Sequence, residues 1–252
     1  DITWMFSEQQ QQSITSGPPP PECPDPLFNN SPVDFTKVAH VLLPGQYRGY
    51  NYKPHGGFIM NPGTTGQVEV KMPMDAKIVG LTRYLESPDK AMQYLITFVN
   101  DCGIEIKFDH LAVLSPRLAA IAETRSPAML DDTRSDPNNR PSPELFKAGE
   151  VIATSIGHPN IKNFSFDFGV TDYRKPNDIS KNKDWVALHD TFIASEWYGV
   201  CWFDMLPGDD SGHAKKLAET PINPSKPNVV SDYCKNVPKT TLDVDGGKPT
   251  DG

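Results

Sequence analysis

A period-two alternation of apolar and polar residues is the feature that most restricts the fold of this chain. Ile104–Phe108 alternates cleanly, as expected of a strand with one buried face. A short polar turn at Asp101–Gly103 precedes it and indicates a hairpin. Similar β-like runs occur at 68–72, 76–85, 92–99, 151–153 and 164–170. The sequence therefore predicts a mostly β fold with an antiparallel core.

The apolar runs are confined to the middle of the chain. Residues 1–33 contain four consecutive Gln and four consecutive Pro, which favour extended backbone and predict a flexible N-terminal arm. The β-rich core is expected at 34–206, and a mostly polar C-terminal extension at 207–252. Within the core, Ser115 as a cap and Pro116 in the first turn predict a short helix over 115–123.

Charge and hydropathy narrow the range of partners. The net charge of −8 disfavours a nucleic-acid partner, because phosphate binding needs a basic face. No apolar run approaches the roughly 18 residues needed to span a membrane. The chain begins at Asp1 rather than Met, so we expect the numbering to start after a cleaved signal peptide. An extracellular or cell-surface location is predicted.

Four cysteines, Cys23, Cys102, Cys201 and Cys234, are spread over the chain without a CxxC pair. An even number in an exported protein favours two disulfides. Three pairings are possible. Cys201–Cys234 is favoured because it would fix the C-terminal extension to the core, and Cys23–Cys102 would then hold the N-terminal arm. Four free, buried thiols are the alternative.

Five motifs, in the same order along the chain, resemble those of the lysostaphin-type zinc metallopeptidases. Val70–Val79 and Phe146–Gly157 look like the two hairpins of its barrel-sandwich core. Pro54–Phe58 is similar to the family's first ligand element, "H-x-G-hydrophobic-D". Ile106–Leu111 resembles its "Y-x-H-L" strand, and Ser165–Gly169 stands where the family carries "H-L-H-F-E". The resemblance implies a duplicated-hairpin (duplicated hybrid motif) β core.

The resemblance also implies a metal site that is incomplete in this chain. His55 matches the first zinc ligand and His110 the histidine of the middle strand. The second ligand position holds Ile59, which cannot bind metal, and the third holds Asp167 in place of His. Ser165 replaces the other histidine of that pair. Catalytic zinc needs three protein ligands and an open position, so no cofactor is expected unless another group completes a Zn²⁺ site.

We therefore predict a polar binding cleft formed by His55, Asp109, His110, Ser165 and Asp167. The leading hypothesis is an exported, non-catalytic binding or structural protein. Its partner would be a cell-wall or extracellular glycan or peptide, or another copy of itself. The alternative is a metal-dependent hydrolase with His55, Asp167 and Asp109 as ligands and His110 as the general base. A simpler interpretation is that His110 and Asp167 only satisfy each other's hydrogen bonds.

Two further segments bear on the partner. Trp197–Phe203 is rich in aromatic residues, which bind sugar faces or anchor interfaces, but packing of the C-terminal extension over the core is the favoured explanation. Trp4 and Phe6 in the N-terminal arm suit self-assembly, and a purely structural subunit would bury them against a neighbouring copy.

Overall fold

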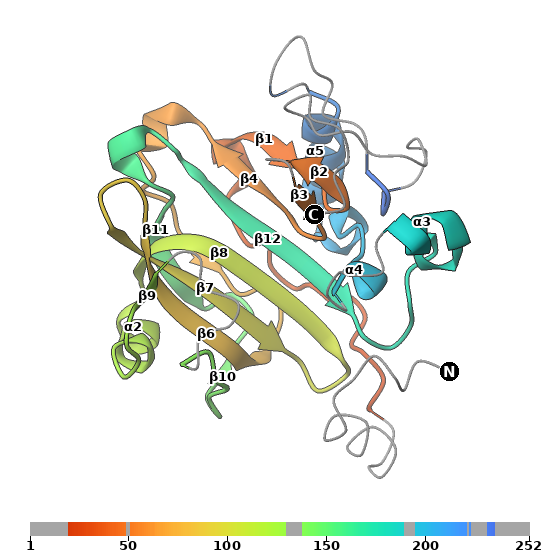
Figure 1. Ribbon diagram of the computed structural model, residues 1–252, viewed down its shortest axis with the longest axis horizontal. Coiled ribbons are helices and arrows are strands. Elements are labelled where there is room, and N and C mark those ends of the chain that lie inside the picture. The colour runs from red at the N-terminus through yellow and green to blue at the C-terminus, as the bar shows by residue number, and fades with distance from the viewer. Residues whose placement is uncertain are drawn as a thin grey trace.

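The computed structural model describes residues 20–48, 51–129, 138–188, 195–220, 222 and 231–234. Within these residues, most strands form one ten-stranded sheet with the order β1-β4-β12-β8-β7-β6-β10, to which β5, β9 and β11 add (Figure 1). β2 and β3 form a separate pair. The strands are β1 Val38–Leu42, β2 Gln46–Arg48, β3 Asn51–Lys53, β4 Gly56–Met60, β5 Val70–Lys71, β6 Ala76–Glu86, β7 Ala91–Val99, β8 Ile104–Leu114, β9 Ala128–Met129, β10 Leu145–Phe146, β11 Val151–Ile156 and β12 Ser165–Asp172.

Helices are short and lie at the margins of the sheet. In Figure 1, α2 lies at one end of the molecule, and α3 and α4 lie near the other end, beyond β12. The α-helices are α2 Pro116–Ala122, α3 Lys183–Leu188, α4 Ser195–Tyr198 and α5 Asp210–Ala218. The 3₁₀ helices are η2 Phe35–Lys37, η3 Pro62–Thr64, η5 Pro159–Ile161, η6 Ile179–Lys181 and η7 Phe203–Met205.

The predicted β class is confirmed, and most predicted strands are present. The alternation in β8 and β12 has its expected consequence, since Ile106, Phe108, Phe166 and Phe168 are fully buried. Gly103 has φ +93° in the β7–β8 turn, a conformation that glycine adopts without strain. The predicted helix is α2, with Ser115 at the N-cap position and Pro116 in the first turn.

β8 changes its neighbour half-way along. Its first part pairs with β12, from Ile104↔Asp172 to Asp109↔Asp167. Its last part pairs with β11 through Leu111 and Leu114. Because Leu111 also pairs with Tyr94 of β7, β11 and β12 must lie along the same edge of β8. The sheet therefore forks at His110.

Aromatic rings form the centre of the core on one face of β12 and β8. Phe168 contacts Phe58, Phe108 and Trp202, with ring centroids 5.8, 5.3 and 5.1 Å apart. These four side chains are fully buried. Asp109 and Asp167 alternate with these rings along β8 and β12, so they project from the opposite face.

Both disulfides predicted from the sequence are present. Cys23 pairs with Cys102 in the β7–β8 turn, and Cys201 pairs with Cys234. The segment that follows Cys23 belongs to the core, because Phe28 and Val33 are buried and the Asn29 N–H donates to the Pro73 carbonyl. Trp4 and Phe6, on which the prediction of self-assembly rests, lie outside the described residues.

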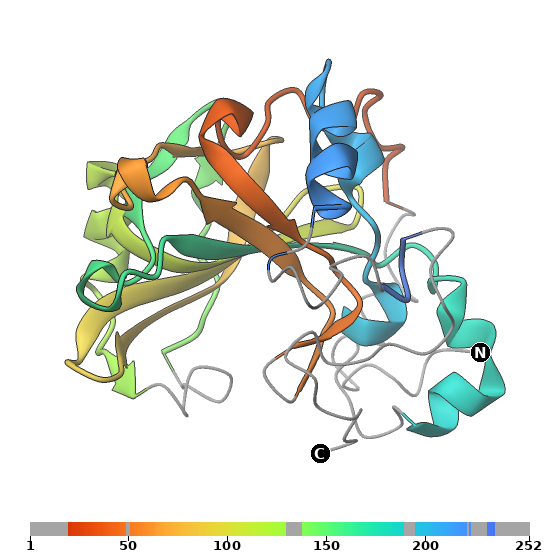
Figure 2. The same cartoon turned by 90° about the horizontal axis from the view of Figure 1, so that it is seen from above.

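The C-terminal extension packs on the sheet through α5. Ala214 and Ala218 of this helix are buried, and α5 contacts β1 and η7. Figure 2 shows α5 standing beside β1, whereas α3 lies farther out. A second, smaller aromatic cluster joins Tyr52, Trp185, Trp197 and Tyr198 near α3 and α4.

Candidate functional site

The polar residues singled out in the sequence meet on the half-buried face of the sheet. Asp167 lies near the start of β12, in register with Gly57 of β4 on one side and with Asp109 of β8 on the other. His55 directly precedes β4, and His110 follows Asp109. We call His55, Asp109, His110 and Asp167 the central polar cluster.

His55 and Asp167 form the closest pair of the cluster. His55 Nε2 lies 2.9 Å from Asp167 Oδ2, and His55 Nδ1 lies 3.5 Å from the Lys107 ammonium. Burial and the nearby Lys107 lower the pKa of His55 to about 4, against the opposing effect of Asp167. His55 is therefore neutral at pH 7. Since the Lys107 ammonium can only donate, Nδ1 accepts from it and Nε2–H donates to the Asp167 carboxylate.

A β-bulge directs His110 toward the cluster. Tyr94↔Leu111 and Ile96↔Phe108 are paired, so Asp109 and His110 together stand opposite the single residue between Tyr94 and Ile96. His110 has φ +61°, in the left-handed region. Such bulges re-aim side chains beside functional sites. Here the bulge lets two consecutive residues, Asp109 and His110, contribute to one group.

Gln93 sets the orientation of the His110 ring. The Gln93 side-chain NH₂ donates to the Gly157 carbonyl at 2.9 Å, so its Oε1 faces His110 Nδ1 at 2.7 Å. Oε1 only accepts, and therefore Nδ1 must carry the proton. In the neutral ring this leaves the lone pair on Nε2, which lies 3.9 Å from Asp167 Oδ2.

Tyr84 completes the second layer of contacts. Its hydroxyl lies 2.8 Å from Asp109 Oδ1 and 3.2 Å from His110 Nδ1. Burial and the Asp109 charge hold the pKa of Tyr84 well above its usual value, so the phenol stays protonated. It donates a hydrogen bond to Asp109 Oδ1 and holds that carboxylate in place.

Negative charge dominates around His110. Burial alone would lower the pKa of His110, but the carboxylates of Asp109, Asp167 and Glu86 outweigh burial and raise it. Burial would likewise raise the pKa of Asp167, yet His55, His110 and Lys107 hold it well below its usual value. Asp167 is therefore ionised throughout the neutral range.

The structure brings together most of the residues predicted for the cleft. Asp109, His110 and Asp167 each offer a ligand atom, and these atoms lie within 4.8 Å of one another, as a metal ion would require. His55 contacts the group through Asp167. Ser165 lies two residues before Asp167 in β12, and its hydroxyl donates to Asn163 Oδ1 at 2.6 Å. Ile59 pairs with Ser165 and offers no ligand atom.

Motif reasoning missed the residues that hold the cluster in place. No recognisable sequence pattern contains Tyr84, Gln93 or Glu86. Lys107 lies within the alternating pattern of β8 and shares a face with Asp109, but the pattern gives it no role in the cluster. Tyr84 and Gln93 pair across the β6–β7 hairpin. Only the register of that hairpin, together with the bulge in β8, would have placed them beside His110.

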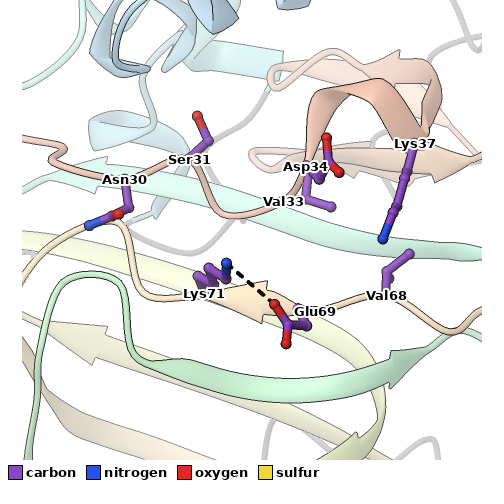
Figure 3. Close-up of a pocket in the computed structure, with 8 residues that line it drawn as sticks. All are labelled: Asn30, Ser31, Val33, Asp34, Lys37, Val68, Glu69 and Lys71. Atoms are coloured by element: carbon purple, nitrogen blue, oxygen red, sulfur yellow. Dashed lines mark ion pairs between the residues drawn. The ribbon is translucent and has the colours of Figure 1, made fainter.

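A separate cavity of about 280 Å³ lies between the N-terminal segment and β5. Figure 3 shows Lys37 and Lys71 reaching into it, with Lys71 paired to Glu69. Asp34 also lines this cavity. Its lining contains two basic and two acidic side chains, which balance in charge, and it shares no residue with the central polar cluster.

The aromatic segment Trp197–Phe203 does not form an exposed platform. Tyr198 and Trp202 are fully buried, and Trp197 and Phe203 are nearly so. Packing, rather than sugar binding, therefore accounts for these side chains.

Comparison with known proteins finds neither a matching family model nor a similar curated protein. Among the described residues, no helix has the length and apolar character required to cross a membrane.

Proposed function

We propose that this protein acts outside the cell as a peptidase-like binding module that holds a cell-wall or extracellular glycan or peptide at the central polar cluster. The observation that carries the proposal is the convergence of His55, Asp109, His110 and Asp167 from three segments onto one face of the sheet. Two disulfides support an oxidising, extracellular environment.

The chemistry of the cluster suits such a ligand. The side chains of His110 and Asp167 are 29% and 20% exposed, so a ligand on this face can reach them. Carboxylates accept hydrogen bonds from sugar hydroxyls and peptide N–H groups. Because the supporting contacts of Tyr84 and Gln93 already fix Asp109 and His110, little side-chain order would be lost on binding.

The resemblance to the lysostaphin-type peptidases agrees with this location and ligand class, and the duplicated-hairpin arrangement that it implies stays a prediction. Non-catalytic binding is favoured because the first ligand position of that family, His55, has both ring nitrogens engaged by Asp167 and Lys107. Self-association through the N-terminal arm is a further prediction, and it concerns residues outside those described.

Metal-assisted hydrolysis of the same ligand is the second candidate. It is favoured by one observation, the position of His110 Nε2 at 3.9 Å from Asp167 Oδ2 while Gln93 Oε1 holds Nδ1. In its neutral form, a histidine held in this orientation can accept a proton from water or bind a metal ion through Nε2.

Sedimentation binding tests the proposal. Purified protein is incubated with insoluble peptidoglycan, chitin or cellulose in the presence of a chelator, and the bound fraction is measured. We expect retention on one of them, at least about tenfold weaker binding for Asp167→Asn, and no change for Asp101→Asn, a surface variant of equal charge change. Absence of retention on all three polymers would contradict the proposal.

The supernatants distinguish the two candidates. Release of soluble fragments or new amino groups, when the chelator is replaced by Zn²⁺ or Mn²⁺, would favour hydrolysis. Binding without release under both conditions would favour the non-catalytic module.

A further inference from the structure

We propose that Asp109, His110 and Asp167 bind one divalent cation, and that His55 supports this site from outside instead of acting as a ligand. This deepens the proposed function by naming the inorganic group that the central polar cluster accepts. The ligand set differs from the one implied by the resemblance, in which His55 and the positions of Ile59 and Asp167 would hold zinc.

The set implied by the resemblance does not fit a metal ion in this chain. Ile59 has a hydrocarbon side chain and pairs with Ser165 across β4 and β12. His55 has no nitrogen to spare, since Nε2–H donates to Asp167 at 2.9 Å and Nδ1 faces the Lys107 ammonium at 3.5 Å. A dication at Nδ1 would also have to approach the positive charge of Lys107.

The Asp109–His110–Asp167 set has the composition of a catalytic or regulatory metal site. Two carboxylates and one imidazole provide three protein ligands and leave a position for water or substrate. Their ligand atoms already lie within 4.8 Å of one another. In a tetrahedral zinc site the ligand atoms are about 3.3 Å apart, given bonds of about 2.0 Å, so the ligand atoms would have to approach one another by at most about 1.5 Å.

Each ligand has the supporting contact that metal ligands generally require. Gln93 Oε1 accepts a hydrogen bond from His110 Nδ1–H. This bond orients the ring so that Nε2 faces the cation. Tyr84 and the His110 backbone N–H both donate to Asp109 Oδ1, each at 2.8 Å, which leaves Oδ2 of that carboxylate for the ion. His55 Nε2–H donates to Asp167 Oδ2, the oxygen that lies 3.9 Å from His110 Nε2, and a carboxylate oxygen keeps a second lone pair for the ion.

The bulge in β8 is the backbone element that makes this set possible. Without the extra residue, Asp109 and His110 would point to opposite faces of the sheet. Left-handed backbone at a non-glycine residue is uncommon, and here it places His110 beside Asp167.

Equilibrium dialysis with Zn²⁺ and Mn²⁺ alone, followed by elemental analysis, tests the inference. We expect about one bound ion per chain for the unaltered protein. Asp109→Asn and His110→Asn should each weaken binding by at least about 100-fold. Asn is chosen at position 110 because it tolerates positive φ. His55→Gln should weaken binding by only about tenfold, as outer-shell substitutions do, and Asp101→Asn should leave it unchanged.

Circular dichroism and thermal unfolding of each variant, without metal, show whether it is folded. As a second readout, Co²⁺ should give visible absorption bands with the unaltered protein and lose them with His110→Asn. Absence of stoichiometric metal in the unaltered protein would overturn the inference. So would loss of binding in His55→Gln with full binding in folded Asp109→Asn, because that result would place the ion at His55.

Failure of the proposed function would look different. Metal bound at one ion per chain, without retention on any polymer, would uphold the cation site and refute the binding module. If the protein binds no metal but is retained on a polymer in the presence of chelator, the binding module stands and the cation site is refuted.

Discussion

Glycines beside the central polar cluster provide the space that its side chains occupy. A Cβ added to Gly169 would lie 2.7 Å from His55 Cβ, and one added to Gly57 would lie 2.6 Å from the Phe166 carbonyl oxygen. Both contacts are shorter than atoms tolerate. The position of His55 against Asp167 therefore depends on the absence of side chains in the neighbouring strands.

We expect Gly169→Ala to lower the free energy of unfolding by about 1–3 kcal/mol, as overpacking generally does, and to weaken the His55–Asp167 contact. Urea unfolding of the variant checks the first effect. Gly63→Ala is the control, because a Cβ there meets no atom within 4 Å. Equal stability of Gly169→Ala and the unaltered protein would show that β12 and His55 move apart easily.

Glu105 carries a charge that the fold disfavours. Burial raises the pKa of Glu105 to about 7, against the opposing effects of the Tyr173 hydroxyl and Lys107. The folded state therefore binds a proton more tightly than the unfolded state, in which Glu105 has its ordinary pKa of 4.5. This preference lowers stability progressively as pH rises from about 4.5 to 7, and the loss is complete above pH 7.

Glu105→Gln should accordingly stabilise the protein at pH 8 and have little effect at pH 4. The full pKa difference corresponds to about 3 kcal/mol, and because the side chain is partly exposed we expect about 1–2 kcal/mol. Urea midpoints of both proteins from pH 4 to 8 measure the gain. A gain that did not depend on pH would contradict the assignment to this carboxyl group.

At the scale of secondary-structure elements, α5 carries an exposed glycine that helix formation does not need. Gly212 lies near the start of this helix, and a Cβ there would meet no atom within 4 Å. We expect Gly212→Ala to raise the free energy of unfolding by about 0.5–1 kcal/mol, because alanine loses less backbone entropy in a helix. No gain in thermal or urea unfolding would indicate that α5 separates from β1 before the sheet unfolds.

The elements also show where sequence patterns succeed and fail. The alternation over Ile104–Phe108 correctly predicted the first half of β8. Alternation alone does not predict the second half, because the bulge puts the next buried residue after Phe108 at Leu111, and a further irregularity opposite β11 puts the following one at Leu114. α5 was missed because its buried face consists of Ala214 and Ala218, whose small side chains give a weak periodic signal.

Predictability of the site follows the same division. His55, Asp109, His110 and Asp167 were found because they lie in motifs with recognisable order. Gln93 and Tyr84 were not, because strand pairing and a bulge, neither of which has a local signature, bring them to His110. The fold class thus follows from alternation, whereas the arrangement of the site follows from register.

At the scale of the whole molecule, two disulfides join segments that are far apart in the sequence. The cysteines of each pair are 79 and 33 residues apart. In the chain-entropy model such loops correspond to about 4 kcal/mol each, and measured losses are typically about 2–4 kcal/mol. We expect Cys23→Ala/Cys102→Ala to lose slightly more stability than Cys201→Ala/Cys234→Ala.

Urea unfolding of both double variants, and of the unaltered protein with and without reductant, checks this order. Each double variant should still lose stability on reduction, because it keeps the other bridge. A reduced protein as stable as the oxidised one would mean that the bridges add nothing to the folded state.

The position of β12 in the sheet determines at which stage of folding the central polar cluster is assembled. Among the residues that the structure describes, β12 is the last strand in sequence, yet it lies between β4 and β8. A chain emerging from its N-terminal end would present β1–β4 and β6–β8 as two separate ladders with open edges, and would lack Asp167 altogether. Insertion of β12 joins both ladders and delivers Asp167 between Gly57 and Asp109 in the same event. A ligand that recognises the complete cluster therefore binds only chains in which β12 has been inserted between β4 and β8. Its binding can serve as a measure of completed folding.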